Sequence, residues 1–299
     1  MMNKKPFVIA AIPAFNEEKN IAKVVLLARK YVDRVVVCDD GSTDMTAEIA
    51  EGLGADVIRH DRNMGYGAAI RSLLYKAREL GADVMVTLDG DGQHNPDQIP
   101  SLLHPILKGE ADVVVGSRFM GKGDETSGYR AAGVRAITGL TDRVSGLGLS
   151  DAQCGFRAYS RRALEAITPS EMGMGVSTEI LIKAADLGLR VVEVPVSVRY
   201  GGLERASTHN PLYHFLDVVA STVKHYSIRH PLLFYGIPGL AALLVASFFW
   251  FWTLAIFAVE RTIVTNIALI AITATIVGLM LLTTAIILFV MVSVIREGR

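Results

Sequence analysis

The sequence predicts a two-part protein: an α/β domain built on a mostly parallel sheet, followed by two helices that cross a membrane as a hairpin. Short apolar runs typical of buried strands alternate with helical periodicity through about the first 115 residues. Residues 232–259 and 262–295 then contain no Asp, Glu, Lys or Arg, and 51% of the 299 residues are hydrophobic. Since a membrane span needs about 20 apolar residues, each run is long enough to cross a bilayer. The 30 basic and 30 acidic residues leave no cationic excess for nucleic-acid binding.

The strands and helices of the first domain follow one another in regular order. The expected strands are 7–12, 34–38, 55–59, 84–88, 113–116 and 190–198, and the expected helices are 17–31, a helix from 43, 66–80 and a helix after Pro96. Ser42 or Thr43 is expected to cap the second helix. From Ser150 the pattern is mixed until the last strand. Alternation of this kind gives a parallel sheet with helices on both faces.

A carboxylate pair follows the central strand, residues 84–88. Asp89 and Asp91 are spaced i and i+2, with glycines at 90 and 92 that leave both side chains uncrowded. Mg²⁺ usually takes one or two protein carboxylates and completes its coordination with phosphate and water. The pair therefore indicates a metal-phosphate site, with an ordinary acidic turn as the alternative.

Four polar loops leave the carboxyl ends of the predicted strands. They are residues 13–18, 39–42, 63–67 and 89–91. Because ligands of such sheets bind outside the carboxyl ends of the strands, these loops are expected to converge on one site. Residues 119–133 are glycine-rich and charged, which is typical of either a mobile lid or a plain surface linker.

The C-terminal region is expected to form a membrane hairpin whose two spans are separated only by Glu260 and Arg261. A hairpin buried in a protein core is the alternative. Residues 211–227 repeat apolar side chains at helical spacing, so this helix either lies in the membrane interface or packs on the soluble domain. The expected division is therefore a catalytic domain at 1–210, an interfacial segment at 211–231 and the spans at 232–299.

The charges that flank the spans predict the orientation. Arg229 precedes the first span, and Arg296 and Arg299 follow the second, whereas the connecting turn has one Arg beside one Glu. Because positive residues remain on the inner side, a two-pass cell-membrane protein with its catalytic domain and both termini in the cytoplasm is expected. The N-terminus has no apolar stretch of signal-peptide length. Cys38 and Cys154 show no metal spacing and are expected as reduced thiols.

The loop sequences together resemble those of a known family. Residues 12–18 (Ile-Pro-Ala-Phe-Asn-Glu-Glu), 39–44, 63–67 and 89–93 are similar to the motifs of glycosyltransferase family 2. Gly116-Ser117-Arg118 and residues 153–157 narrow the resemblance to the branch of dolichyl-phosphate mannose synthases and polyprenyl-phosphate glucosyltransferases. The resemblance covers about residues 7–210 and implies a Rossmann-like domain of the glycosyltransferase A type.

The resemblance implies a nucleotide-sugar and metal site. The implied nucleotide-sugar residues are Pro13, Phe15, Glu17, Asp39, Asp40, Asp89, Gly90, Asp91, Arg199 and Arg205. Mg²⁺ or Mn²⁺ is implied at Asp89, Asp91 and Gln93. Two departures from mannose synthases leave the donor open between UDP- and GDP-linked sugars. Phe15 replaces a tyrosine, and the lysine expected after Arg199 is absent, with Arg205 as its substitute.

The resemblance also implies an acceptor site for a polyprenyl phosphate. Arg118, Arg130 and Arg135 are the candidates to hold the lipid phosphate, because the guanidinium fork suits bidentate contact with phosphate oxygens. Asp91, Arg118 and Asp151 are the expected catalytic residues; for Asp151, orienting a nearby arginine is the alternative role. Arg157 is as readily structural.

The expected activity is inverting, metal-dependent transfer of one hexose from a nucleotide sugar to a polyprenyl phosphate at the cytoplasmic membrane face. Two alternatives stay open: transfer to a polysaccharide or glycolipid, and a catalytically inactive scaffold that binds nucleotide sugar. Processive synthases of the family carry a Gln-x-x-Arg-Trp motif, which this chain lacks. The expected partners are the nucleotide sugar, the lipid and the membrane, with no nucleic acid; a homo-oligomer is compatible with the sequence.

Overall fold

The computed structural model describes residues 5–120, 128–198, 220, 223–224, 226–228 and 230–297, with the backbone alone for 128–132 and 295–297. The chain divides into two compact units, Met1–Thr222 and Val223–Arg299. The predicted boundary at 210 and most of the predicted interfacial segment, 211–231, lie outside the described residues.

The first unit contains a seven-stranded sheet in the order β3-β2-β1-β4-β6-β5-β7. The strands are β1 (Val8–Ala14), β2 (Arg34–Asp39), β3 (Asp56–Arg59), β4 (Val84–Thr87), β5 (Val113–Ser117), β6 (Arg157–Ser160) and β7 (Val191–Pro195). All neighbouring pairs are parallel except those of β6, which runs antiparallel to both β4 and β5. The mostly parallel sheet is confirmed, but the sequence did not predict β6 or its place inside the sheet.

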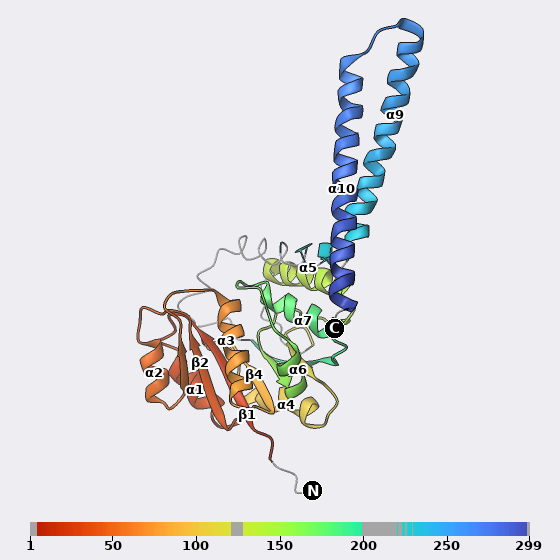
Figure 1. Ribbon diagram of the computed structural model, residues 1–299. Coiled ribbons are helices and arrows are strands. Elements are labelled where there is room, and N and C mark those ends of the chain that lie inside the picture. Colours follow the sequence, from red (N-terminus) through yellow and green to blue (C-terminus); the bar gives the residue numbers. More distant parts are fainter. Residues whose placement is uncertain are drawn as a thin grey trace. The chain divides into compact units, whose positions relative to one another are not determined.

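Helices connect the strands, and Figure 1 shows how they lie against the sheet. They are α1 (Ile21–Ala28), α2 (Thr46–Gly52), α3 (Tyr66–Glu79), the 3₁₀ turn η1 (Pro96–Gln98), α4 (Ile99–Leu107), α5 (Gly128–Ser145), α6 (Arg161–Ala166) and α7 (Val176–Asp186). The predicted caps of α2 are wrong, because the helix begins at Thr46 and no side chain caps it at the preceding residue. The loop prediction for 119–133 is wrong from Gly128 onward, where α5 begins; residues 121–127 lie outside the described part.

The strand register explains why the predicted loops meet. β1 pairs with β2 on one side and with β4 on the other, with Ala14 opposite Asp39 and Ala11 opposite Thr87. Every residue of β1 is buried, and α3 packs against both β1 and β2. Since the three strands are parallel, the loops that follow them leave the same edge of the sheet.

The second unit is a helical hairpin. It contains the π-helical turn η2 (Leu232–Gly236), α9 (Ile237–Glu260) and α10 (Thr265–Glu297), and α9 and α10 lie side by side in Figure 1. Pro238 accounts for the π turn: it has no N–H to donate to the carbonyl of Phe234, and the N–H of Ile237 donates instead to the carbonyl of Leu232.

Small residues and one polar pair join the two helices. A Cβ at Gly278 would lie 3.0 Å from the carbonyl oxygen of Gly239, so only glycine permits this approach. The indole N–H of Trp250 donates to the hydroxyl of Thr275 at 3.1 Å. Leu232–Glu260 and Thr265–Val294 are long and apolar enough to cross a membrane, and only 11% of each apolar window is buried within the described chain. Such low burial disfavours a core hairpin.

Candidate active site

Backbone and side-chain hydrogen bonds join the first two loops at the carboxyl edge of the sheet. Asn16 adopts a left-handed backbone, with φ of 56°, and its N–H donates to the hydroxyl of Ser42 at 2.8 Å. In return the N–H of Thr43 donates to the side-chain oxygen of Asn16, also at 2.8 Å. The N–H of Glu17 donates to the hydroxyl of Thr46 at 2.7 Å. These crossed contacts hold loops 13–18 and 39–46 as one unit, with Phe15 about one third exposed (36%) on it.

The two aspartates at the end of β2 have different surroundings. Both are only 4% exposed. Asp39 accepts a long hydrogen bond of 3.3 Å from the N–H of Ser42. Asp40 uses both oxygens inside the protein, where it accepts from the N–H groups of Met64 at 3.0 Å and Gly65 at 2.8 Å and lies 2.6 Å from Nδ1 of His60. The carboxylate of Asp40 therefore organises the loop before α3.

The acidic pair Asp89 and Asp91 follows β4, as predicted. The pKa of each is raised to about 6, chiefly by burial, and for Asp91 the negative charge of Asp89 contributes to the rise. The N–H of Gln93 donates to Asp91 Oδ1 at 2.9 Å, so the backbone folds back over the pair. Two buried carboxylates this close hold negative charge that a bound cation would offset.

The residues around the pair fit a divalent metal. Among the described residues no group of three His, Cys, Asp or Glu side chains is placed to hold a metal by itself. An ion at Asp89, Asp91 and the side-chain oxygen of Gln93 would therefore complete its coordination with phosphate and water, which is usual for Mg²⁺. All these ligand atoms are oxygens, as Mg²⁺ and Mn²⁺ prefer.

Three further residues position Asp89. Nδ1 of His94 accepts from the N–H of Asp89 at 3.1 Å, and the imidazole stacks on Phe156 with ring centroids 5.1 Å apart. Burial lowers the pKa of His94 to about 4, so the ring is neutral at pH 7. The hydroxyl of Tyr66 donates to Asp89 Oδ1 at 3.4 Å. A Cβ at Gly155 would lie 3.1 Å from the same oxygen, so this position has no room for a side chain.

Glu17 lies near this pair. Burial raises the pKa of its carboxyl, and the negative charges of Asp91, Asp44 and Asp89 raise it further, while the side-chain amide of Asn20 donates to it at 3.0 Å. The first loop and the acidic pair thus share one electrostatic environment, as the predicted convergence of the loops requires.

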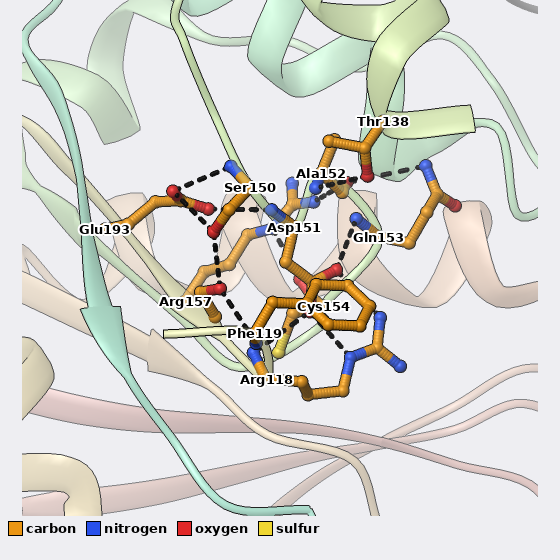
Figure 2. A network of polar contacts seen from close by, with 11 residues as sticks. Arg118, Phe119, Thr138, Ser150, Asp151, Ala152, Gln153, Cys154, Arg157 and Glu193 are labelled. Carbon is orange, nitrogen blue, oxygen red and sulfur yellow. Dashed lines mark hydrogen bonds and ion pairs between the residues drawn. The ribbon is translucent and has the colours of Figure 1, made fainter. Parts of the chain in front are cut away.

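Arg118 and Asp151 form a bidentate ion pair at the end of β5 (Figure 2). Nε of Arg118 donates to Asp151 Oδ2 at 2.6 Å and Nη2 donates to Oδ1 at 2.8 Å. The Arg118 side chain is 15% exposed and Asp151 is fully buried. The guanidinium also lies close enough to Asp89 to lower its pKa. The structure thus brings a basic group from β5 to the acidic pair that follows β4.

Glu193 of β7 holds the loop that carries Asp151 (Figure 2). Its carboxylate accepts from the N–H groups of Ser150 and Asp151, both at 2.8 Å, and from the hydroxyl of Ser150 at 2.9 Å. Arg157 is 2% exposed, and its guanidinium donates to the carbonyls of Cys154, Ala152 and Ser177. Arg157 therefore has a structural role in the same network.

The other predicted arginines are only partly described. Phe119 is near two guanidinium groups: the Cζ of Arg118 is 6.0 Å and the Cζ of Arg135 is 5.1 Å from its ring centroid. Both arginines therefore lie near the same aromatic ring. The side chain of Arg130, and the whole of Arg199 and Arg205, lie outside the described residues, so their predicted roles stay predictions.

Sequence reasoning missed four residues that hold the site: His60, Tyr66, His94 and Glu193. Tyr66 and His94 lie in or beside the quoted motifs, so their positions carried a signal. His60 directly follows β3, and its backbone N–H donates to the carbonyl of Asp39 at 2.9 Å. Glu193 is one polar residue within an apolar strand, and nothing in the local pattern links it to Ser150.

Comparison with known proteins assigns this chain to one protein family. The family model described as "Glycosyl transferase family 2" matches residues 9–168. A UDP-N-acetylglucosamine–dolichyl-phosphate N-acetylglucosaminyltransferase of Methanococcus voltae is 40% identical over 126 residues, which is 36% of this chain and 50% of that protein. A dolichol-phosphate mannosyltransferase of Pyrococcus furiosus is 34% identical over 131 residues, 40% of this chain and 36% of that protein. The matched segments thus span half or less of these relatives.

Solved structures agree with the fold. Glucosyl-3-phosphoglycerate synthase from Mycobacterium tuberculosis, crystallised with Mn²⁺, UDP and phosphoglyceric acid, matches with a TM-score of 0.59 and 26% identity. The match covers 74% of this chain and 78% of that one. The predicted α/β fold of the glycosyltransferase A type is confirmed.

Proposed function

Because the chain belongs to glycosyltransferase family 2, we propose that it transfers a single hexose from a nucleoside-diphosphate sugar to a polyprenyl phosphate. One observation carries the proposal. The Arg118–Asp151 pair lies near enough to the Asp89/Asp91 pair that Arg118 lowers the pKa of Asp89. A site of this kind can hold a metal-bound diphosphate and a second anion side by side, which is what transfer to a phosphate oxygen requires.

The donor binds along the loops that follow β1, β2 and β4. Pro13, Phe15, Glu17 and Asp39 line the nucleotide end, while Asp89, Asp91 and Gln93 would hold Mg²⁺ or Mn²⁺ at the diphosphate end. Uridine is the favoured base, since the Methanococcus relative is named for UDP-N-acetylglucosamine and the Mycobacterium structure contains UDP. A cation bound there would supply positive charge that stabilises the departing diphosphate.

The acceptor is activated by position. A phosphate monoester is already an anion near pH 7, so its oxygen can attack the anomeric carbon without a strong general base. A new bond forms between that carbon and the phosphate oxygen as the bond to the nucleoside diphosphate breaks, and attack from the opposite face inverts the configuration. Asp151 engages the Nε–Nη2 edge of Arg118, so its role in the proposal is to orient the arginine toward the acceptor phosphate.

The hairpin supports a location at a membrane, because α9 and α10 are long and apolar enough to cross one. In the proposal these helices keep the chain where the long lipid is available, and the flanking arginines favour cytoplasmic termini. A protease-cleavable tag at Arg299 in intact cells tests this orientation. Cleavage by external protease without lysis would contradict it.

The decisive experiment supplies the full-length protein with Mn²⁺, a polyprenyl phosphate and a panel of radiolabelled UDP- and GDP-sugars. We expect label to enter organic solvent with one donor, only when the cation is present. The matched control is Asp91→Asn. Label that enters only a glycolipid or polysaccharide would assign another acceptor. Binding of UDP without cation-dependent release of nucleoside diphosphate from any donor would instead identify an inactive scaffold.

A further inference from the structure

A buried chain of polar side chains begins at Asp40 and leads away from the donor site. Asp40 Oδ1 lies 2.6 Å from Nδ1 of His60, and Nε2 of His60 lies 2.9 Å from the hydroxyl of Ser72 on α3. The side chains of His60 and Asp40 are 9% and 6% exposed. The sulfur of Cys38 lies 3.6 Å from the same Nε2. Every polar atom of the imidazole thus has a partner inside the protein.

The hydrogen-bond network assigns the proton on the imidazole. An ionised aspartate only accepts, so Nδ1 of His60 carries a hydrogen and donates to Asp40. In the neutral tautomer that this contact selects, Nε2 of His60 accepts from the Ser72 hydroxyl. Burial raises the pKa of the Cys38 thiol to about 12, and the charges of Asp40 and Asp39 contribute to the rise. Cys38 therefore stays neutral and adds no charge to the chain.

Asp40 in turn fixes the loop between β3 and α3. It accepts from two successive N–H groups, those of Met64 and Gly65. Gly41 lies directly on this loop, because a Cβ there would fall 2.4 Å from the carbonyl carbon of Arg62. The end of β2 and residues 62–65 therefore have little freedom to move apart.

The same loop connects the two ends of the donor site. At one end Met64 and Gly65 of this loop donate to Asp40. At the other end the loop continues into Tyr66, whose hydroxyl donates to Asp89 of the acidic pair. Residues 64–66 thus contact Asp40 and Asp89, and a nucleoside diphosphate held between Asp39 and Asp89 would lie near them. Its affinity thus depends on the shape of this loop before the ligand arrives.

We propose that His60 is a positioning residue for donor binding: its Nδ1–H orients Asp40, and Asp40 holds residues 64–65 in the shape that receives the nucleoside diphosphate. The inference rests on the proposed function, because it needs a nucleotide at this site. His60 does not touch the donor. It acts through Asp40, and the contact at Nε2 serves only to hold the ring.

Two substitutions separate the two edges of the imidazole. In His60→Asn the amide nitrogen falls close to the position of Nδ1, so the contact with Asp40 is kept and that with Ser72 is lost. In His60→Gln the amide nitrogen falls close to Nε2, so the contact with Ser72 is kept and Asp40 loses its donor. Since a hydrogen bond to a charged group contributes about tenfold or more in an equilibrium constant, we expect His60→Gln to weaken UDP by about tenfold.

Two measurements are needed on the full-length protein in detergent: calorimetry of UDP and GDP, each with Mn²⁺, and transfer kinetics. In calorimetry, His60→Gln should bind UDP more weakly, whereas His60→Asn should keep most of the wild-type affinity. In the kinetics, His60→Gln should raise the KM for the donor with little change in kcat. Ser72→Ala is the matched control for the Nε2 edge and should behave like His60→Asn. Amide hydrogen exchange at Met64 and Gly65 should be faster in His60→Gln than in His60→Asn.

The outcomes are distinguishable. A wild-type protein that binds neither nucleotide would overturn the proposed function. If the wild type binds a nucleotide, and His60→Asn and His60→Gln bind it equally well, the role of His60 is refuted while the proposed function stands. If His60→Gln does not fold, Asp40→Asn carries the same test, because its amide keeps one acceptor but cannot serve both loop amides and Nδ1. Unchanged UDP affinity and unchanged amide exchange in Asp40→Asn would then refute the proposal.

Discussion

The proposed donor side and acceptor side of the site differ in how their charges are balanced. On the proposed donor side, Asp89 and Asp91 lie close together, and burial raises the pKa of both to about 6. On the acceptor side, the buried carboxylate of Asp151 is paired with Arg118 through two short hydrogen bonds. We therefore expect the donor side to need positive charge from a bound cation, whereas the acceptor side contains a positive charge of its own, on Arg118. Variants of the two sides should accordingly fail in different ways.

The largest effect is expected for Asp91→Asn. The amide keeps the shape of the carboxylate but loses the charge that attracts Mg²⁺ or Mn²⁺. Transfer should fall by at least about a hundredfold without loss of folding, and Asp89→Asn should be similarly severe. Asp97→Asn, at an exposed carboxylate on η1, is the control for surface charge. Turnover of Asp91→Asn within tenfold of wild type at ordinary cation concentration would remove the metal assignment.

Arg118→Ala tests the acceptor side. Transfer should fall about a hundredfold while UDP affinity changes little, because a contact made to the reacting phosphate is lost. Arg118→Lys should also be impaired, since lysine lacks the bidentate fork. Removal of Arg118 leaves Asp151 buried without its partner, so the melting temperature should fall as well.

The double variant Arg118→Ala/Asp151→Asn separates these two effects. It should regain thermal stability but not transfer activity. If transfer returns with stability, Arg118 is a structural residue. If the single variant loses UDP affinity as strongly as transfer, Arg118 belongs to the donor side and the comparison of the two sides is wrong.

Gly155→Ala probes the packing around Asp89. The added methyl group would lie 2.8 Å from the Tyr66 hydroxyl and 3.1 Å from Asp89 Oδ1, so one of them must move. We expect Mn²⁺ affinity and transfer to fall about tenfold, as for other small displacements of catalytic groups. Gly52→Ala, where nothing lies within 4 Å of the added atom, is the matched control. Equal behaviour of the two variants would show that Asp89 tolerates displacement.

Truncation after His230 removes the hairpin and leaves the donor residues intact. Donor and Mn²⁺ binding should survive, because the described chain divides into two compact units close to this position. Transfer to a long polyprenyl phosphate should fall by about tenfold more than transfer to a short, water-soluble prenyl phosphate. Equal losses with both acceptors would mean that the helices support the fold or an oligomer.

The smallest expected effect is on thermal stability, through the dependence of the cation-free protein on pH. The folded protein holds the Asp89 and Asp91 protons up to about pH 6, whereas the ordinary pKa is 3.8. The unfolded chain releases these protons first, so cation-free stability falls as pH rises from about 4 to 6. Mn²⁺ should therefore raise the melting temperature by a few degrees at pH 7.5 and hardly at pH 5. Asp91→Asn should abolish most of the difference between the Mn²⁺ effects at the two pH values. A wild-type protein that Mn²⁺ stabilises equally at both pH values would contradict the prediction.

Most of the donor side followed from the sequence. Strand, loop and helix signals are local, and the carboxyl ends of neighbouring parallel strands must meet, so the convergence of loops 13–18, 39–42 and 89–91 could be predicted. The inward orientation of Asp40 could not. Two adjacent aspartates look alike in sequence, and only the positions of His60 and Met64 decide which of them faces the protein.

The acceptor side depended on strand order. Arg118 meets Asp151 because β6 enters the sheet between β4 and β5, and Glu193 reaches the same loop because β7 pairs with β5. The residues of these pairs lie 33 and 42 positions apart in the chain. Local periodicity gives no information on which distant segments become neighbours, so the sequence named Arg118 and Asp151 but did not determine the contact between them.

The sequence by itself determined the alternation of strands and helices, the acidic pair after the central strand, and two charge-free runs long enough to cross a membrane. Each depends on the chemistry of consecutive residues. The tertiary structure decided how Asp89, Asp40 and Arg118 are oriented, and which of their oxygens and nitrogens already have partners. The reason is physical: the environment of a buried charge is set by the segments packed around it, and long-range strand pairing brings those segments together.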